Sequence, residues 1–332
     1  MASPAVKPTL EPVVHGGDLG EISRRFPDAP QPWIDLSTGI NPIAYPVPTL
    51  PASAWATLPT AAAAQALLVV AAQRYGVRDP ANIVAAPGTQ ALIQILPGLL
   101  AKSRVAVLGP TYLEHEACWR RHGHDVSAVE HLEQASGSDV LIVVNPNNPT
   151  GRLLAASALR DHAGLLVVDE AFMDLLPHTA SLAPDLPPRT VVLRSFGKTY
   201  GLAGVRLGFA IAEAPLIERM RAALGPWAVS GPALEVGRLA LSDERWLADT
   251  RRRLGELGTR LDTLLGGVDL EVIGGTPLFR LTRHRAARSI AERLGCGGIH
   301  VRRFAGHPDW LRFGLPADDA AFDRLEAALK SG

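Results

Sequence analysis

Short apolar segments separated by helical stretches fill the middle of this chain, and this alternation constrains the fold most. The segments that we expect to form strands between about residues 55 and 225 are 104–108, 140–144, 165–169, 190–194 and 207–212. Strands separated by helices need crossover connections, which favour a mostly parallel sheet covered by helices. We therefore expect an α/β fold, which binds ligands where its strands end and its helices begin.

The length of 332 residues is too great for one ordinary core and suggests a large and a small domain. Residues 1–50 are rich in Pro and Gly, so we expect an extended arm that lies across the rest of the chain. We expect a large domain over 51–230 and, after the Gly231-Pro232 break, a smaller C-terminal α/β domain over 231–332. Its expected strands are 270–273, 278–282, 299–304 and 309–315, and its expected helices are 245–265, 285–294 and 317–330.

The composition argues against several classes of protein. Lys and Arg number 33, as do Asp and Glu, so no nucleic-acid surface is predicted. The most apolar window, Ala61 to Ala72, is too short to span a membrane, and the first residues contain no apolar signal core. Cys118 and Cys296 are far apart, which indicates two buried thiols in a reducing, cytoplasmic compartment. The ten histidines have no zinc-type spacing, so we assign no metal.

A lysine follows the apolar strand at 191–193, in Ser195-Phe196-Gly197-Lys198. A lysine in such a turn can form a Schiff base with an aldehyde cofactor, although most loop lysines are only solvated. Ser195 and Arg206 can both reach a phosphate on that cofactor. Other polar groups also follow expected strands or begin a helix, namely Gly88-Thr89-Gln90, Asn145 to Gly151 and Asp169-Glu170-Ala171-Phe172.

The order of these motifs resembles the fold-type-I pyridoxal-phosphate enzymes of the aspartate aminotransferase superfamily, over nearly the whole chain. The matching residues are Gly88-Thr89-Gln90, Tyr112, Asn148-Pro149-Thr150-Gly151, Asp169-x-Ala171, Ser195-x-x-Lys198 and Arg206. Any one of these motifs is weak, but all of them in order are a strong signal. The resemblance implies pyridoxal 5'-phosphate as the cofactor and a homodimer.

The resemblance also implies a role for each residue. Lys198 binds the cofactor and transfers protons, and Asp169 keeps the ring nitrogen protonated, although Asp at this place is also a common helix N-cap. Asn148 donates to the phenolic oxygen of the cofactor and Tyr112 stacks on its ring; in isolation, these residues are typical of a turn and of a core aromatic. The implied phosphate ligands are Gly88, Thr89, Gln90, Ser195 and Arg206.

The N-terminal segment narrows the choice of substrate. Its His15-Gly16-Gly17-Asp18 and Asp35 to Pro42 stretches resemble the threonine-phosphate decarboxylases of cobalamin biosynthesis. In that family the arm covers the active site, and the substrate is a small phosphorylated amino acid, O-phospho-L-threonine, which becomes (R)-1-aminopropan-2-ol O-phosphate. The implied substrate-binding residues are His15, Gly16, Gly39, Asn148, Arg302 and Arg312.

Arg312 and Arg302 are assigned to substrate binding for different reasons. Arg312 alternates with apolar neighbours on an expected strand, where its planar fork suits a carboxylate, although a structural ion pair also explains it. Arg302 matches a second substrate arginine in related enzymes of phosphorylated substrates. Arg303 is expected to point to the opposite side of the same strand.

Two alternatives share the fold. Histidinol-phosphate aminotransferases are similar, but such enzymes usually carry Tyr where this chain has Phe172, and Tyr-Pro where it has Leu58-Pro59. A non-catalytic ligand-sensing domain is the other alternative, and the intact set of Lys198, Asp169 and Arg206 argues against it. Because a fold alone does not fix the chemistry, decarboxylation rests on family resemblance.

Overall fold

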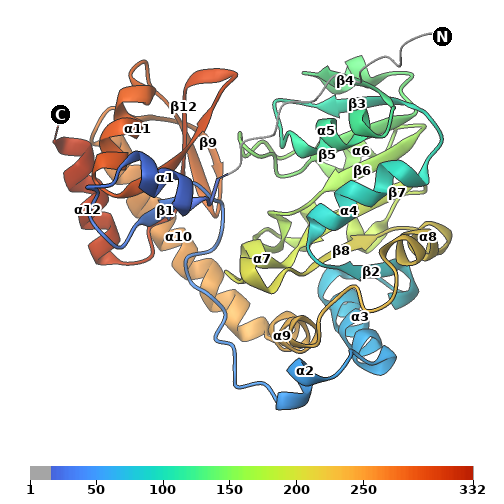
Figure 1. Ribbon diagram of the computed structural model, residues 1–332. Coiled ribbons are helices and arrows are strands. Elements are labelled where there is room, and N and C mark those ends of the chain that lie inside the picture. Colours follow the sequence, from blue (N-terminus) through green and yellow to red (C-terminus); the bar gives the residue numbers. More distant parts are fainter. Residues whose placement is uncertain (1–15, 332) are drawn as a thin grey trace, which may run out of the picture.

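The computed structural model describes residues 16–331, which form two sheets with helices packed around them (Figure 1). The first sheet has seven strands in the order β2-β8-β7-β6-β5-β3-β4. These strands are β2 (Ile83–Ala86), β3 (Arg104–Leu108), β4 (Asp125–Val129), β5 (Val140–Val144), β6 (Leu165–Asp169), β7 (Thr190–Ser195) and β8 (Gly208–Ile211). Strands β4, β3, β5, β6 and β7 pair in parallel, whereas β8 pairs antiparallel with both β7 and β2. The prediction of a mostly parallel sheet is confirmed.

Both faces of this sheet are covered, as the continuous apolar runs of its central strands require. All five residues of β5 are buried. Leu141 and Val143 belong to the core under α3 and α9, whereas Val140 and Ile142 belong to the opposite core, under α4, α5 and α8. The bounds of these helices are α3 (Ala61–Tyr75), α4 (Thr89–Ile95), α5 (Glu114–Arg121), α8 (Ala214–Leu224) and α9 (Gly231–Ser242).

The sequence predicted five of these seven strands. It missed β2, which is short and runs directly into the Pro87-Gly88 turn. It also missed β4, an edge strand whose exposed Asp125 and Ser127 interrupt any apolar run. The apolar window at 61–72 became helix α3, which begins at a hydrogen bond from Ala63 N to Thr60 Oγ1 and ends at Gly76, with a φ of 68°.

The second sheet has five strands in the order β1-β11-β12-β10-β9. They are β1 (Ile34–Leu36), β9 (Glu271–Thr276), β10 (Phe279–Arg283), β11 (Ile299–Phe304) and β12 (His307–Gly314). The helices beside them are α1 (Leu19–Arg25), α10 (Glu244–Gly266), α11 (Ala287–Cys296) and α12 (Asp319–Lys330). The three short helices elsewhere are α2 (Ala52–Ala56), α6 (Ala156–Leu159) and α7 (Phe196–Thr199).

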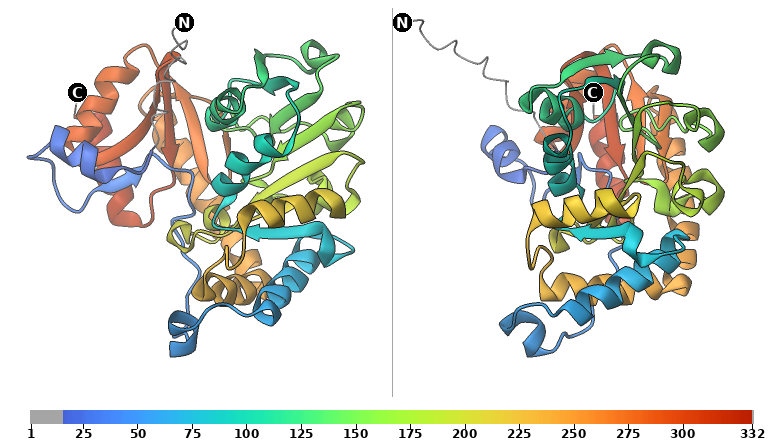
Figure 2. Two further views of the ribbon diagram at one scale, coloured as in Figure 1. Left: turned by 45° about the vertical axis from the view of Figure 1, so that its right-hand side comes forward. Right: turned by 90° about the vertical axis from the view of Figure 1, so that its right-hand side faces the viewer.

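The segment 16–50 is more ordered than an extended arm. Its β1 pairs in parallel with β11, with Ile34 opposite Ile299, and α1 precedes it. Figures 1 and 2 show this blue segment against the red C-terminal elements. The chain then crosses to the first sheet. A segment without a core of its own is therefore fixed by a strand pair with distant residues, which local sequence does not reveal.

One expectation about the cysteines was wrong. Cys118 is buried, but Cys296 is exposed, because it is the last residue of α11 and faces solvent there. Within residues 16–331, no helix is both long and apolar enough to cross a membrane. The division into domains at residues 50 and 230 stays a prediction.

Candidate active site

A cavity of about 340 Å³ lies where the parallel strands of the first sheet end, and the second sheet forms its opposite wall. Strands β3, β5, β6 and β7 run in the same direction, so the residues that follow them meet at one edge. Twelve of the predicted site residues line the cavity: Gly16, Gly88, Thr89, Gln90, Tyr112, Asn148, Asp169, Ser195, Lys198, Arg206, Arg302 and Arg312.

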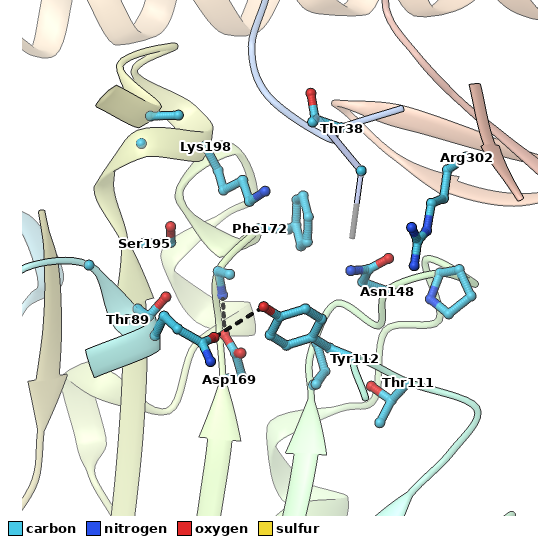
Figure 3. Close-up of a pocket in the computed structure, with 18 of the residues that line it drawn as sticks. Thr38, Thr89, Thr111, Tyr112, Asn148, Asp169, Phe172, Ser195, Lys198 and Arg302 are labelled. Carbon is cyan, nitrogen blue, oxygen red and sulfur yellow. Dashed lines mark hydrogen bonds between the residues drawn. The ribbon is translucent and has the colours of Figure 1, made fainter. Parts of the chain in front are cut away.

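Lys198 lies on α7, directly after β7, and reaches into this cavity (Figure 3). Its Nζ is 5.7 Å from the centroid of the Phe172 ring. Burial, followed by repulsion from Arg312, lowers the pKa of Lys198 to about 8, against an opposing effect of Asp169. A lysine whose pKa lies this low has about a tenth of its amine in the neutral, nucleophilic form at pH 7, far more than an ordinary lysine has.

Asp169 is the last residue of β6 and is buried. Its Oδ1 accepts a hydrogen bond of 3.0 Å from Ala171 N, so it closes the following turn as well as lining the cavity. Its Oδ2 lies 2.9 Å from Nε2 of His115, a buried residue of α5. A carboxylate only accepts hydrogen bonds, which assigns the proton to His115 Nε2. Sequence reasoning missed His115, whose only local signal is its place three residues after Tyr112.

The start of α4 and Arg206 form a cationic corner of the cavity. Gly88 precedes α4 with a φ of 86°, and a β-carbon there would lie 2.6 Å from Arg206 Nη2. A β-carbon at Gly208 would lie 2.5 Å from Thr89 N. Glycine at both positions therefore lets the guanidinium and the backbone of the helix start approach each other. Together with the nearby hydroxyls of Thr89 and Ser195, these groups suit a phosphate.

Tyr112 is held in place by a chain of side chains, and Figure 3 draws the hydrogen bond of its hydroxyl. Its hydroxyl donates to Gln90 Oε1 over 3.1 Å, and Gln90 Nε2 donates to Glu114 Oε2 over 2.9 Å. Burial, followed by the charge of Glu114, raises the pKa of Tyr112 well above its usual value. The phenol therefore stays neutral, and Gln90 has a structural task besides lining the cavity.

Asn148 is oriented by an arginine from the second sheet. Arg312 Nη1 donates to Asn148 Oδ1, and its Nη2 donates to the Ser37 carbonyl over 2.6 Å. Because the amide oxygen is taken by Arg312, the amide nitrogen is the end that faces Phe172 and Tyr112 (Figure 3). Asn148 is therefore fixed as a hydrogen-bond donor toward the cavity.

Arg302 and Arg312 are direct cross-strand partners on β11 and β12, and both line the cavity. Burial, followed by repulsion from Arg302, lowers the pKa of Arg312 to about 9, and burial also lowers the pKa of Arg302. Like charges placed opposite each other destabilise a sheet unless an anion compensates them. Arg303 is exposed and pairs with Glu292 at 3.3 Å, away from the cavity, as predicted.

Among the described residues that were predicted to bind substrate, Gly39 does not line the cavity. Gly39 is buried, and a β-carbon there would lie 2.8 Å from Phe172 Cε1 and 3.0 Å from Phe279 Cδ1. Its place is thus beside these rings, for which it leaves room. His15 lies outside the described residues.

Further lining residues came only from the structure. Thr38, Thr111, Leu113 and Phe304 all contribute to the wall. No group of three or more His, Cys, Asp or Glu side chains in the described part of the chain could hold a metal ion.

Known proteins are similar to this chain in sequence. Residues 52–329 match the family model described as aminotransferase class I and II. A threonine-phosphate decarboxylase of Pseudomonas aeruginosa is 43% identical, over 95% of this chain and 96% of its own length. A second, from a Sinorhizobium species, is 42% identical over 96% and 98%.

A solved structure extends the comparison to the fold. The histidinol-phosphate aminotransferase of Sinorhizobium meliloti in complex with pyridoxal-5'-phosphate superposes with a TM-score of 0.79 over 99% of this chain and 97% of its own, at 21% identity. At that identity the likeness concerns the fold alone. With the family match over most of its length, this chain belongs to the aminotransferase class I and II family.

Proposed function

We propose that this protein is a pyridoxal-phosphate-dependent decarboxylase that converts O-phospho-L-threonine to (R)-1-aminopropan-2-ol O-phosphate for cobalamin biosynthesis. The observation that carries the proposal is the pair Arg302 and Arg312, which face the same cavity as Lys198. A phosphorylated amino acid has two anionic groups around one amine, and this wall offers two cations to them. The relatives at 43% and 42% identity support the same reaction.

The residues present fit the cofactor. Lys198 would hold its aldehyde carbon, Asp169 its ring nitrogen, and Asn148 its phenolic oxygen, while Tyr112 would cover one ring face. The residues suited to its phosphate are Gly88, Thr89, Gln90, Ser195 and Arg206. When bound, pyridoxal phosphate supplies an electron sink for the electron pair left at the substrate α-carbon.

The protein would then have three tasks in the reaction. Arg312 would bind the substrate carboxylate, and Arg302 the phosphate, so that the bond from the α-carbon to the carboxylate is correctly oriented. That bond breaks, the carboxylate leaves as CO₂, and its electron pair stays with the α-carbon. Lys198 would deliver the proton that replaces CO₂, which its lowered pKa favours by making proton exchange easy near neutral pH.

Phe172 supports decarboxylation over amino-group transfer. Its side chain is 3% exposed and faces the lysine without a hydroxyl. The tyrosine usual at this place in related aminotransferases would give the cofactor's phenolic oxygen a second donor. Because Phe172 has no hydroxyl, Asn148 is the one residue that we assign as a donor to the phenolic oxygen.

The test is a single incubation of the purified protein with pyridoxal phosphate and O-phospho-L-threonine, without any keto acid. We expect CO₂ and aminopropanol phosphate in equal amounts, and none of either from the Lys198→Ala variant. Glutamate formed from histidinol phosphate and 2-oxoglutarate, with no CO₂ from phosphothreonine, would assign the protein to the aminotransferases instead. A protein that acquires no cofactor absorbance would be a ligand-binding domain without this chemistry.

We also propose that the enzyme is a homodimer in the cytoplasm. Trp55, Leu58 and Trp227 are exposed by 70%, 64% and 59%, and large exposed apolar side chains suit a subunit interface. Cys118 and Cys296 are both free, which supports a reducing compartment. Sedimentation equilibrium of the wild type and of Trp55→Ser tests the dimer, which the substitution should weaken.

A further inference from the structure

The turn that carries Asn148 meets the edge of the second sheet at a close backbone contact. Strand β9 is the outermost strand of that sheet, and its Gly274-Gly275 pair lies against Thr150-Gly151. A β-carbon at Gly151 would collide with the Gly275 carbonyl oxygen and lie 2.5 Å from Gly275 N. A β-carbon at Gly274 would collide with the Thr150 carbonyl oxygen. Only glycine on both sides lets the two backbones approach this closely.

Hydrogen bonds within the turn link this contact to Asn148, so we expect a displacement at the contact to reach Asn148. Asn147 Oδ1 accepts hydrogen bonds from Thr150 N and Thr150 Oγ1, over 3.1 and 2.9 Å. Asn147 Nδ2 donates to Thr111 Oγ1 over 3.1 Å, and Gly151 N donates to the Asn147 carbonyl over 2.8 Å. Asn148 lies between Asn147 and Thr150, which these hydrogen bonds tie to each other.

The second sheet therefore holds the Asn148 turn at two places. The backbone of β9 contacts Thr150 and Gly151, while Arg312 of β12 donates a hydrogen bond to Asn148 Oδ1. Strand β9 is also irregular here: Val272 pairs with Thr282 and Gly274 with Leu281, which leaves Ile273 as an extra residue. A bulge followed by glycines re-aims an edge strand, and here it brings the strand's backbone onto the turn.

We propose that Gly151 and Gly274 are positioning residues of the active site, which act through Asn148. Their backbone contact sets the position of the Asn148 amide relative to the bound cofactor. It also sets the distance between the arginines of the second sheet and Lys198 of the first. The proposal rests on the proposed function for the identity of the cofactor and substrate, but not for the contact itself.

Two variants test the contact from its two sides. Gly151 has a φ of 73°, which Asn tolerates, so Gly151→Asn adds a side chain against Gly275 with little backbone strain. Its matched control is Gly137→Asn, because Gly137 has a φ of 77° and nothing within 4 Å of its β-carbon position. Gly274→Ala adds a methyl group on the β9 side of the same contact. Its control is Gly255→Ala, because Gly255 lies in a helix and nothing lies within 4 Å of its β-carbon position.

The measurements are the melting temperature of the apoprotein, a pH titration of the bound cofactor's absorbance, and kcat/KM. We expect both test variants to raise the pH midpoint of the absorbance, because a displaced Asn148 donates less well to the phenolate form of the cofactor. We also expect kcat/KM to fall by about tenfold or more, since sub-ångström placement governs such steps. The two controls should keep the wild-type midpoint and kcat/KM.

A wild-type absorbance midpoint in both test variants would overturn the proposal, whatever happens to their melting temperatures. Loss of folding in one variant leaves the other to decide, since each adds its side chain to a different element. If both variants fold poorly but the loaded fraction keeps the wild-type spectrum, the glycines have only a packing role. If the wild type releases no CO₂ from phosphothreonine, the proposed function fails, while the absorbance titration still decides the contact.

Discussion

His115 Nε2 lies 2.9 Å from Asp169 Oδ2, and both side chains are buried. The pair joins α5 to the end of β6, beneath the cavity that Lys198 enters. Asp169 is the carboxylate assigned to the cofactor's ring nitrogen, so its position matters to within a fraction of an ångström. His115 fixes one carboxylate oxygen, and Ala171 N fixes the other.

Replacing His115 should therefore affect both stability and cofactor binding. His115→Leu leaves Asp169 Oδ2 buried without this donor, and we expect the free energy of unfolding to fall by about 2 kcal/mol. The affinity for pyridoxal phosphate should fall as well, which fluorescence titration measures. His115→Gln keeps a hydrogen-bond donor at nearly the same place, so it should retain most of the stability and most of the cofactor affinity. Equal behaviour of the Leu and Gln variants would mean that the histidine acts only by filling space.

The lowered pKa of Lys198 predicts how cofactor loading depends on pH. With a pKa of about 8, the lysine is mostly protonated at pH 7 and mostly neutral at pH 9. The neutral fraction, and with it the initial loading rate of the apoprotein, should rise roughly tenfold over that interval. The rate is followed by the absorbance of the bound cofactor in a stopped-flow instrument.

Burial and Arg312 are the leading causes of this lowered pKa, which provides a control. The Arg312→Met variant removes one repelling charge, so the pKa of Lys198 should rise and the loading midpoint should move to higher pH. A loading rate that is independent of pH between 7 and 9 in the wild type would contradict the assignment. If the pH midpoint of loading is unchanged in Arg312→Met, Arg312 does not contribute to the lowered pKa of Lys198.

The sequence predicted the half of the site that is carried by local motifs. Residues at or just after the ends of strands, such as Asn148, Asp169 and Lys198, are recognisable because strand and turn residues lie next to each other in the chain. His115 is 54 positions from Asp169, and no local pattern indicates that they meet. The same applies to β1, whose partner β11 lies at the other end of the chain.

Gly39 illustrates a different limit of sequence reasoning. By resemblance, it was expected to touch the substrate, but its neighbours are the rings of Phe172 and Phe279. A glycine gives no indication from sequence of whether it makes room for a ligand or for a side chain. Only the packing of three distant segments decides between these two roles.

Arg302 should matter for substrate binding, because it faces the cavity beside its cross-strand partner Arg312. We expect Arg302→Met to raise KM for O-phospho-L-threonine about 30-fold, as the loss of a charge-assisted hydrogen bond predicts. Steady-state kinetics measures the effect.

A neighbouring residue supplies the matched control for this prediction. Arg303 lies on the same strand, but it faces solvent and pairs with Glu292. Arg303→Met should leave KM within about twofold of wild type, since exposed ion pairs contribute little. An Arg302→Met variant with an unchanged KM would show that Arg302 does not bind the substrate.

Gly39 and Phe172 should be energetically coupled, because a β-carbon at position 39 would lie 2.8 Å from the Phe172 ring. We expect Gly39→Ala to lower the free energy of unfolding by about 1–3 kcal/mol, as overpacking of a well-filled core does. Phe172→Leu makes room at the same place, so the double variant should lose less than the sum of the two single losses, by at least about 0.5 kcal/mol. Urea unfolding of the four apoproteins completes the cycle.

Gly255→Ala combined with Phe172→Leu is the control, since nothing lies within 4 Å of the β-carbon position of Gly255 and strict additivity is expected there. Additivity in the Gly39 cycle as well would mean that Phe172 shifts to accommodate the methyl group, and that the glycine is not needed to hold the ring beside Lys198.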